Sequence, residues 1–300
     1  MNFGGNYSWP TVIIGGAPRS GTSSLFDMLH STGAFRRHSR KELFLLNDRN
    51  FWIHGETPGY EEVGSRCYDL AGFGPKECFV DASTTYLYQD VAPDACTKWL
   101  AVNRSSPFVV IFCLREPAER LYSNFRYFRD VLLLIPEETS FVEHVDALLD
   151  RTVRTGNQQI DQALDHGLYP QYLKRWESAV GAKRIIVIRT DELTATPQAV
   201  VSRIGTGIDL PLTIGVSARK NASYKPRFRN LHSIARRFGA KIPHGRVRES
   251  LKAAYVRLTL DTPRSSERRD DLLALDRVRS YYKKHSDEFE TYGLTWYEAA

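Results

Sequence analysis

The sequence has few of the residues that build metal sites and disulfide frameworks. Its 300 residues include four cysteines, none of them in a C-x-x-C pair, and eight scattered histidines. These spacings do not match the usual zinc patterns, so we expect no metal requirement. Cys113 lies in the apolar run FVVIFCL and is expected to be a buried thiol. Nothing in the spacing of Cys67 and Cys78 requires them to pair, so a reducing compartment is expected.

Long apolar runs are also missing. No stretch approaches the roughly 18 apolar residues that a membrane-spanning helix needs. The first residues, MNFGGNYSWP, lack the basic region and apolar core that mark a signal peptide. Apolar residues make up 42% of the chain and charged residues 25%, an ordinary globular mixture. We therefore expect a soluble, cytoplasmic protein without a membrane span.

Acidic residues are nearly absent from one stretch. Over residues 215–250 the sequence has ten Lys or Arg and a single acid, Glu249, within a chain of net charge +6. Two interpretations stay open: a solvated face of surface helices, or a basic wall that attracts a polyanion or a doubly phosphorylated nucleotide. The stretch has no recognised nucleic-acid reader motif, so nucleic acid is not an expected partner.

Apolar runs that alternate with helical patterns indicate the fold. Buried strands are predicted at Thr11–Gly15, Glu77–Ser83, Pro107–Leu114 and Lys183–Arg189. Helices are predicted in SSLFDMLHSTG, in REPAERLYSNFRYFRDVLLL, in YPQYLKRWESAV and, as one long element, from about Glu267 to Tyr292. This alternation predicts a three-layer α/β fold, with a mainly parallel central sheet flanked by helices. Ligands of such sheets bind beyond the carboxyl ends of the strands.

The chain contains no internal repeat and no clear linker. We expect a single domain over residues 1–300. Within it, residues 35–75 read as an irregular, substrate-facing region, and residues 215–300 as a basic and helical C-terminal part of the same domain.

The segment GGAPRSGTSS, Gly15 to Ser24, has the glycine spacing of a phosphate-binding loop but lacks its lysine. A Walker A loop reads G-x-x-x-x-G-K-[ST], and Thr22 stands here in the lysine position. A glycine-rich turn between a buried strand and a helix directs backbone N–H groups and the helix dipole at one point, which makes an anion site. The fixed cation of this loop is Arg19, which suits a group shorter than a triphosphate.

A second basic element follows the strand predicted at Pro107–Leu114. In LREPAERLYSNFRYFRD, Arg115 comes at the end of the strand and Ser123 eight residues later, two turns along a helix. A guanidinium and a hydroxyl at these positions can bind one phosphate. A surface salt bridge between Arg115 and Glu119 is the competing interpretation.

Together the two elements resemble the paired motifs of the sulfotransferase family, whose members take a sulfuryl group from 3′-phosphoadenosine-5′-phosphosulfate (PAPS). The family's first motif, approximately P-[RK]-[SGA]-G-T-[TS], binds the 5′-phosphosulfate and is similar to Pro18–Ser23. Its second, approximately L-R-[ND]-P-x-x-R-x-x-S, holds the 3′-phosphate and is similar to LREPAERLYS, with Glu116 in place of Asn or Asp. Gly167–Leu193 resembles a further family segment, G-x-Y-x-x-x-L-x-x-W. The likeness covers most of the chain and is weakest over residues 35–75.

The resemblance, closest to soluble bacterial and carbohydrate-type members, implies a P-loop-like fold and a set of PAPS-binding residues. Three of these residues match a family loop that closes over the 3′-phosphate, Ser24 is a hydroxyl donor directly after the first motif, and the others belong to the two motifs. The implied set is Pro18, Arg19, Ser20, Gly21, Thr22, Ser23, Ser24, Arg115, Ser123, Lys220, Asn221 and Tyr224.

The segment SRKELFLLND places Lys41 and Glu42 about twenty residues past the phosphate loop. In carbohydrate sulfotransferases of the heparan type, a K-E-P segment at this point supplies the glutamate that deprotonates the acceptor hydroxyl. The resemblance therefore implies Glu42 as general base and Lys41 as an assisting cation near the sulfuryl group, although Leu43 replaces the proline. Asp81, His38 and His54 stay open as further candidates for the base.

The sequence thus predicts a PAPS-dependent sulfotransferase that acts on a hydroxyl of a carbohydrate or small metabolite by in-line displacement, with adenosine 3′,5′-bisphosphate as product. Arg19 and the loop N–H groups are expected to stabilise the charge that develops on the bridging oxygen. Two functions of different classes compete with this prediction. One is an ATP-dependent P-loop kinase, and the second is a non-enzymatic polyanion-binding protein that uses residues 215–250. The sequence does not predict the acceptor or the oligomeric state.

Overall fold

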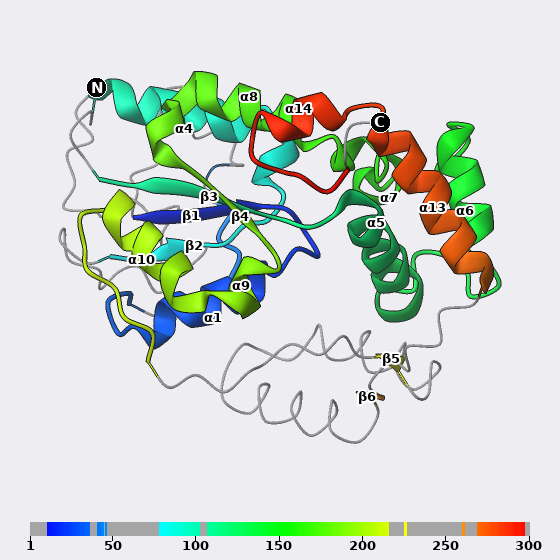
Figure 1. Ribbon diagram of the computed structural model, residues 1–300, viewed down its shortest axis with the longest axis horizontal. Helices are drawn as coiled ribbons and strands as arrows, with labels where there is room; N and C mark the ends of the chain where they lie inside the picture. The colour runs from blue at the N-terminus through cyan, green and yellow to red at the C-terminus, as the bar shows by residue number, and fades with distance from the viewer. Residues whose placement is uncertain are drawn as a thin grey trace. The chain divides into compact units, whose positions relative to one another are not determined.

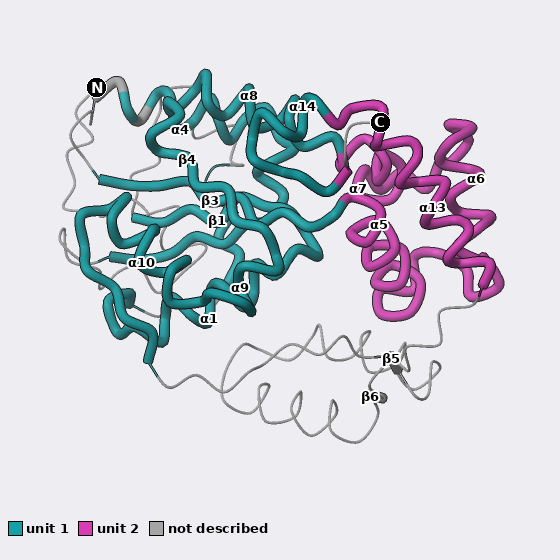
Figure 2. Tube along the Cα trace, viewed as in Figure 1, with its two compact units in different colours: residues 1–116, 168–220, 287–296 teal, residues 117–167, 221–286, 297–300 magenta. Residues whose placement is uncertain are grey.

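The computed structural model describes residues 11–36, 41–44, 46, 78–102, 107–215, 225–226, 260–261 and 269–297. The chain divides into two compact units (Figure 2). Unit 1 comprises residues 1–116, 168–220 and 287–296, and unit 2 comprises residues 117–167, 221–286 and 297–300. Most of the regions 35–75 and 215–250 lies outside the described residues, and the single domain stays a prediction.

Four strands of the described chain form one parallel sheet in unit 1. They are β1 (Val12–Gly16), β2 (Val80–Asp81), β3 (Val109–Leu114) and β4 (Ile185–Arg189), in the order β2-β1-β3-β4. β1 and β3 are buried along their whole length, as expected for β-branched runs in a parallel sheet. The four predicted strands are confirmed: β1 has the predicted length, shifted by one residue, and the other three are shorter than predicted.

Helices cover both faces of this sheet, which confirms the three-layer α/β prediction. On one face lie α1 (Thr22–Ser31), α9 (Glu192–Ala195) and α10 (Pro197–Gly207) (Figure 1). On the opposite face lie α4 (Val91–Val102), α8 (Tyr169–Val180) and α14 (Ser286–Glu290). Two short 3₁₀ turns, η3 (Tyr86–Tyr88) and η6 (Ala182–Arg184), complete the described elements of this unit.

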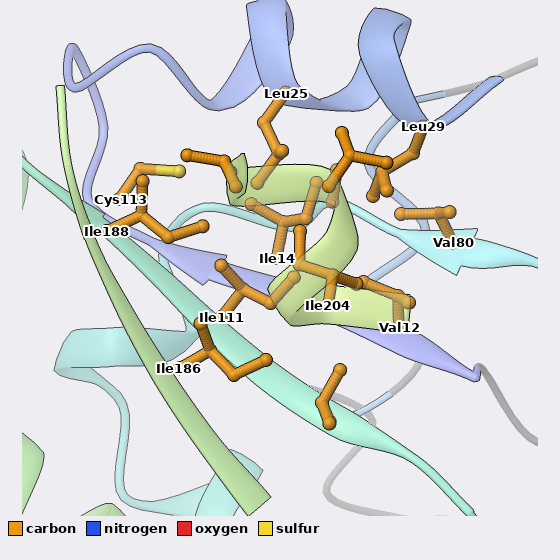
Figure 3. Close-up of a cluster of buried hydrophobic side chains, with 14 of the residues drawn as sticks. Val12, Ile14, Leu25, Leu29, Val80, Ile111, Cys113, Ile186, Ile188 and Ile204 are labelled. Carbon is orange, nitrogen blue, oxygen red and sulfur yellow. The ribbon is translucent and has the colours of Figure 1, made fainter. Parts of the chain in front are cut away.

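The core of unit 1 follows from the two-residue period of the strands. Alternate strand side chains meet α1 and α10 in one buried cluster (Figure 3), to which Val12, Ile14, Leu25, Leu29, Ile111, Ile186, Ile188 and Ile204 belong. Cys113 lies in the same cluster and is a free, buried thiol, as predicted. On the opposite face, Phe112 meets Trp176 of α8 edge to face at 5.4 Å. Helices thus pack against both faces of β3.

Unit 2 is mainly helical in its described part. It contains α5 (Pro117–Arg126), the π-helix η4 (Tyr127–Val131), α6 (Phe141–Leu149), α7 (Gln158–Asp161), η5 (Asp165–Gly167), α13 (Arg269–Lys283) and the antiparallel pair β5 (Lys225–Pro226) and β6 (Leu260–Asp261). Inside it, the buried Arg120 donates to the carbonyl of Ala163, and the Tyr282 hydroxyl donates to that of Leu164 at 2.6 Å. These bonds satisfy main-chain acceptors where α7 gives way to η5.

Two helix predictions need correction. The single helix predicted from about Glu267 to Tyr292 is wrong, because α13 ends at Lys283 and α14 begins at Ser286. The N–H of His285 bonds to the carbonyl of Tyr282 at 2.9 Å, an i to i−3 turn that closes the helix. The helix predicted after Arg115 continues beyond Arg126 as a π-helix rather than an α-helix.

Candidate active site

The turn between β1 and α1 has the geometry of an anion-binding loop. Gly21, at the N-cap of α1, adopts a left-handed φ of 85°, and Arg19 has a φ of 68°. Gly21 has no side chain that could cap the helix, and the first turn of α1 contains no acidic residue. The backbone N–H groups at a helix N-terminus and the helix dipole favour a negatively charged ligand.

Ser20 adds a buried donor to this loop. Its side chain is fully buried, and its Oγ has no hydrogen-bond partner among the residues that the structure describes. A buried hydroxyl without a partner loses its hydrogen bonds to water without replacement, and is often completed by a ligand. The residues present therefore fit an anionic group. Pro18, Ser23 and Ser24, also predicted for this site, are half-buried around the same turn.

The ends of β3 and β4 support the loop from behind. The Thr190 hydroxyl lies 3.0 Å from the carbonyl oxygens of both Ser20 and Leu114. Gly21 packs so closely on Leu193 that a Cβ there would lie 2.6 Å from its Cδ1. Neither Thr190 nor Leu193 was predicted from the sequence. A polar residue directly after a buried parallel strand was the signal that could have found Thr190.

Lys41 contacts the loop at Thr22, although the two residues are 19 positions apart in the sequence. Its Nζ donates to Thr22 Oγ1 at 3.2 Å and lies 3.7 Å from Glu42 Oε1. The lysine missing from the loop's own sequence is thus supplied by a separate segment. Burial lowers the pKa of Lys41, while the carboxylates of Glu42 and Asp27 act in the opposite direction.

Glu42 lies beside the same loop and keeps part of its surface open. Its Oε1 accepts a hydrogen bond from Thr84 Oγ1 at 3.3 Å in addition to the ion pair with Lys41. Its side chain is 38% exposed, so the carboxylate remains accessible. The structure therefore brings both predicted acceptor-side residues to the phosphate loop.

Asp81, a further candidate for the base from the sequence, is enclosed at the end of β2. It is fully buried and accepts hydrogen bonds from Ser83 Oγ, the Tyr86 hydroxyl and the N–H of Leu43. Burial raises its pKa to about 6 despite these bonds, which act in the opposite direction. The two histidines considered for the same role, His38 and His54, lie outside the described residues.

The residues predicted for the 3′-phosphate fall in different parts of the chain. Arg115 follows β3 in unit 1, is half-buried, and its carbonyl accepts the Tyr169 hydroxyl at 2.9 Å. Ser123 is half-buried on α5, within unit 2. Lys220, Asn221 and Tyr224 lie outside the described residues.

The described residues contain neither a metal cluster nor a membrane-spanning helix. No group of three or more His, Cys, Asp or Glu in this part of the chain is placed to hold a metal ion. No helix in the same residues has both the length and the apolar character needed to cross a membrane.

Comparison with known families decides what kind of protein carries this loop. A family model described as "Sulfotransferase domain" matches residues 10–225. The chain belongs to the sulfotransferase family. The match includes both the loop after β1 and the Arg115 element, so the resemblance drawn from these residues is confirmed at the level of the family. A comparison with curated protein sequences gives no match.

Solved structures agree with the fold of this sulfotransferase. The crystal structure of a sulfotransferase from Alicyclobacillus acidocaldarius aligns with a TM-score of 0.54 at 17% identity, over 91% of this chain and 96% of that one. At this identity the likeness shows the fold alone. A sulfotransferase domain from the curacin biosynthetic pathway also aligns, with a TM-score of 0.43 at 18% identity, over 69% of this chain and 76% of that one. Its TM-score is too low for a conclusion about this chain.

Proposed function

We propose that this sulfotransferase takes its sulfuryl group from PAPS and transfers it to a hydroxyl of a carbohydrate or small metabolite. The observation that carries the proposal is the contact of Lys41 with Thr22, because it brings a cation and the neighbouring carboxylate of Glu42 to an anion-binding loop. An anion site, a cation and an accessible base in one place are what transfer of an anionic group requires.

The residues of the loop would hold the phosphosulfate end of PAPS. Backbone N–H groups at the start of α1 and the buried hydroxyl of Ser20 would donate to its oxygens, and Arg19 would balance its charge. Arg115 and Ser123 are proposed for the 3′-phosphate on the strength of their motif. Lys220, Asn221 and Tyr224 are proposed for it on the same ground. A phosphate held away from the reacting centre lowers the entropy cost of orienting that centre.

PAPS supplies a sulfuryl group on a phosphate leaving group: the bond from the acceptor oxygen to sulfur forms as the bond from sulfur to the bridging phosphate oxygen breaks. Glu42 takes the proton of the acceptor hydroxyl on its exposed carboxylate. Arg19 and the loop N–H groups stabilise the charge that the departing oxygen gains. Lys41 lowers the repulsion between the anionic sulfuryl group and the incoming oxygen.

Glu42 is preferred to Asp81 as the base because of accessibility. Three hydrogen bonds occupy the two oxygens of Asp81, whose side chain is fully enclosed. The carboxylate of Glu42 is partly exposed beside Lys41. A general base must reach the proton that it removes.

The proposal also includes four expectations from the sequence about domain organisation, cellular location, the acceptor and metal dependence. They are a single domain over residues 1–300, a cytoplasmic location, a small-molecule or glycan acceptor as the partner, and no requirement for a metal. The basic stretch 215–250 would favour an anionic glycan among these acceptors.

The proposal is tested with ³⁵S-labelled PAPS and a panel of acceptors that contains glucose, N-acetylglucosamine, unsulfated heparosan and 4-nitrophenol. We expect label on at least one hydroxyl acceptor, and Arg19→Ala to lower kcat by roughly 10²-fold, as for loss of an oxyanion donor. Ser123→Ala should mainly raise the Kd of adenosine 3′,5′-bisphosphate. An enzyme that transfers label equally well without Arg19 would contradict the role of the loop.

A further inference from the structure

Side chains at the end of β2 hold the segment that carries Lys41 and Glu42. The N–H of Ala82 donates to the carbonyl of Lys41 at 3.1 Å. In return, three main-chain N–H groups of the segment donate to side chains that follow β2: Leu43 to Asp81 Oδ1 (3.2 Å), Phe44 to Ser83 Oγ (2.7 Å) and Leu46 to the Tyr86 hydroxyl (3.1 Å). The main chain on both sides of Glu42 is therefore held by residues that lie at the end of β2 or follow it.

Asp81 connects these acceptors to one another. Ser83 Oγ donates to its Oδ1 at 2.6 Å, and the Tyr86 hydroxyl donates to its Oδ2 at 2.6 Å. All three side chains are fully buried, so they act on a substrate only through the segment that they hold. Each hydroxyl donates to the carboxylate and accepts a main-chain N–H, which fixes the direction of both bonds.

The held segment contains a strained residue. Phe44 has a φ of 55°, a left-handed conformation that is unfavourable for a bulky residue. Its N–H makes the short bond to Ser83, two residues after Glu42. Together with the bonds at Leu43 and Leu46, this bond holds Phe44 in the left-handed conformation and fixes the backbone beside Glu42.

We propose that Asp81 is a positioning residue of the transfer reaction, which acts through Ser83 and Tyr86 to present Glu42 and Lys41 to the phosphate loop. The assignment rests on the proposed function, because the roles of Glu42 and Lys41 are defined there. In this assignment Asp81 positions Glu42, and Glu42 is the base that removes the proton of the acceptor hydroxyl.

The charge of Asp81 matters for this task. The ionised carboxylate offers both oxygens as acceptors, whereas a protonated one gives up an acceptor position. Burial raises the pKa of Asp81 to about 6, so the network is complete above this pH and weakened below it. The titratable groups that face it are Tyr86 of η3 and Cys96 of α4, whose pKa values burial also raises, and the held segment carries Lys41 and Glu42.

The experiment compares Asp81→Asn and Tyr86→Phe with the wild-type enzyme, using labelled PAPS and the panel acceptor that the wild type sulfates fastest. Tyr292→Phe is the matched control, since it removes a tyrosine hydroxyl that donates to Glu177 at 3.0 Å elsewhere in unit 1. We expect kcat to fall about tenfold or more in the first two variants, because small misplacements of catalytic groups are costly. The Kd of adenosine 3′,5′-bisphosphate should stay within about twofold in all three, because the loop itself is unchanged.

The pH profile separates positioning from a general loss of structure. Asn resembles the protonated carboxyl, so the ratio of kcat in D81N to wild-type kcat should rise toward one as pH falls through about 6. A ratio independent of pH, or a kcat within twofold of wild type in both variants, would overturn the assignment. So would a loss of adenosine 3′,5′-bisphosphate affinity that parallels the loss of kcat. If D81N does not fold, Tyr86→Phe gives the same comparison of kcat with affinity. A wild-type enzyme that transfers no label from PAPS would instead reject the proposed function.

Discussion

Lys41 shows how a single residue completes a site from a distance. The Lys41 side chain is three-quarters buried, and desolvation by this burial works against the charged form of its ammonium group. The hydroxyl of Thr22 and the carboxylate of Glu42 are its contacts toward the site. An anion bound in the loop would favour the charged form further, so that the cation and the ligand stabilise each other.

Replacement of Lys41 by Met keeps most of the buried hydrocarbon stem and removes the charge. We expect kcat to fall by roughly 10²-fold, in the range found for loss of one transition-state donor. The affinity for adenosine 3′,5′-bisphosphate, which lacks the sulfuryl group, should change less. Lys174→Met, at an exposed position of α8, is the control and should leave both values unchanged. Steady-state kinetics and calorimetry measure the two quantities, and an unchanged kcat in K41M would contradict the role given to Lys41.

The raised pKa of Asp81 leads to a prediction about how the free energy of unfolding depends on pH. Its pKa is about 6 in the folded protein against an ordinary value of 3.8, so between these values the folded protein binds the proton more tightly than the unfolded chain does. The free energy of unfolding therefore falls as pH rises through this interval, and the loss is complete above about pH 6.

Asp81→Asn removes this ionisation. The difference in unfolding free energy between D81N and wild type should therefore shift in favour of D81N as pH rises, by about 3 kcal/mol at most. Urea denaturation at about pH 4.5 and about pH 7.5 measures the shift. A difference that is the same at both pH values would mean that Asp81 titrates at its ordinary value.

Among the elements, β1, the loop that follows it and α1 form the anion-binding part of the candidate site. Its turn needs a residue that tolerates a left-handed backbone and has no side chain, because Gly21 combines a φ of 85° with close packing on Leu193. Gly33, just past the C-terminal end of α1, has a similar φ of 74° but nothing within 4 Å of the Cβ position. A substitution at Gly33 therefore introduces backbone strain alone, whereas a substitution at Gly21 introduces both backbone strain and a steric clash.

We expect Gly33→Ala to lower the free energy of unfolding by about 1–2 kcal/mol, the cost of a left-handed non-glycine residue. Gly21→Ala should cost more, since its Cβ would meet Leu193 Cδ1 at 2.6 Å, and should also weaken binding of adenosine 3′,5′-bisphosphate. Urea denaturation and calorimetry on both variants provide the test. Equal effects of the two substitutions on binding would show that the loop geometry at Gly21 is unimportant for the ligand.

The periodicity of apolar residues in the sequence predicted most helices and strands, whereas the remaining features depend on contacts between residues far apart in the sequence. The helix YPQYLKRWESAV is found at Tyr169–Val180, because its apolar residues lie on one face and Pro170 fits the first turn. The final helix looked continuous, since periodicity does not reveal the turn at Lys284–His285 that closes α13. The Lys41 segment was placed from resemblance, but its contact with Thr22 was not predictable. It depends on hydrogen bonds to Asp81, Ser83 and Tyr86, about forty residues away.

At the scale of the whole molecule, the parallel sheet explains why groups so far apart in sequence meet. In unit 1 the loop follows β1, Asp81 ends β2, Arg115 follows β3 and Thr190 follows β4. Parallel strands place their carboxyl ends at one edge, where ligands of such sheets bind. The order β2-β1-β3-β4 sets the loop between the strand that supports Glu42 and the strand that leads to Arg115. We therefore expect the acceptor on the β2 side of the loop and the 3′-phosphate on the β3 side.

Titration calorimetry with adenosine 3′,5′-bisphosphate shows whether the loop after β1 is part of a PAPS site. We expect saturable binding without added divalent metal, weakened about tenfold or more by Arg115→Ala, which removes a charge-assisted phosphate contact. Titration of the same protein with ATP and Mg²⁺ should give much weaker binding. Tight binding of ATP with Mg²⁺ and none of adenosine 3′,5′-bisphosphate would contradict the assignment of a PAPS site.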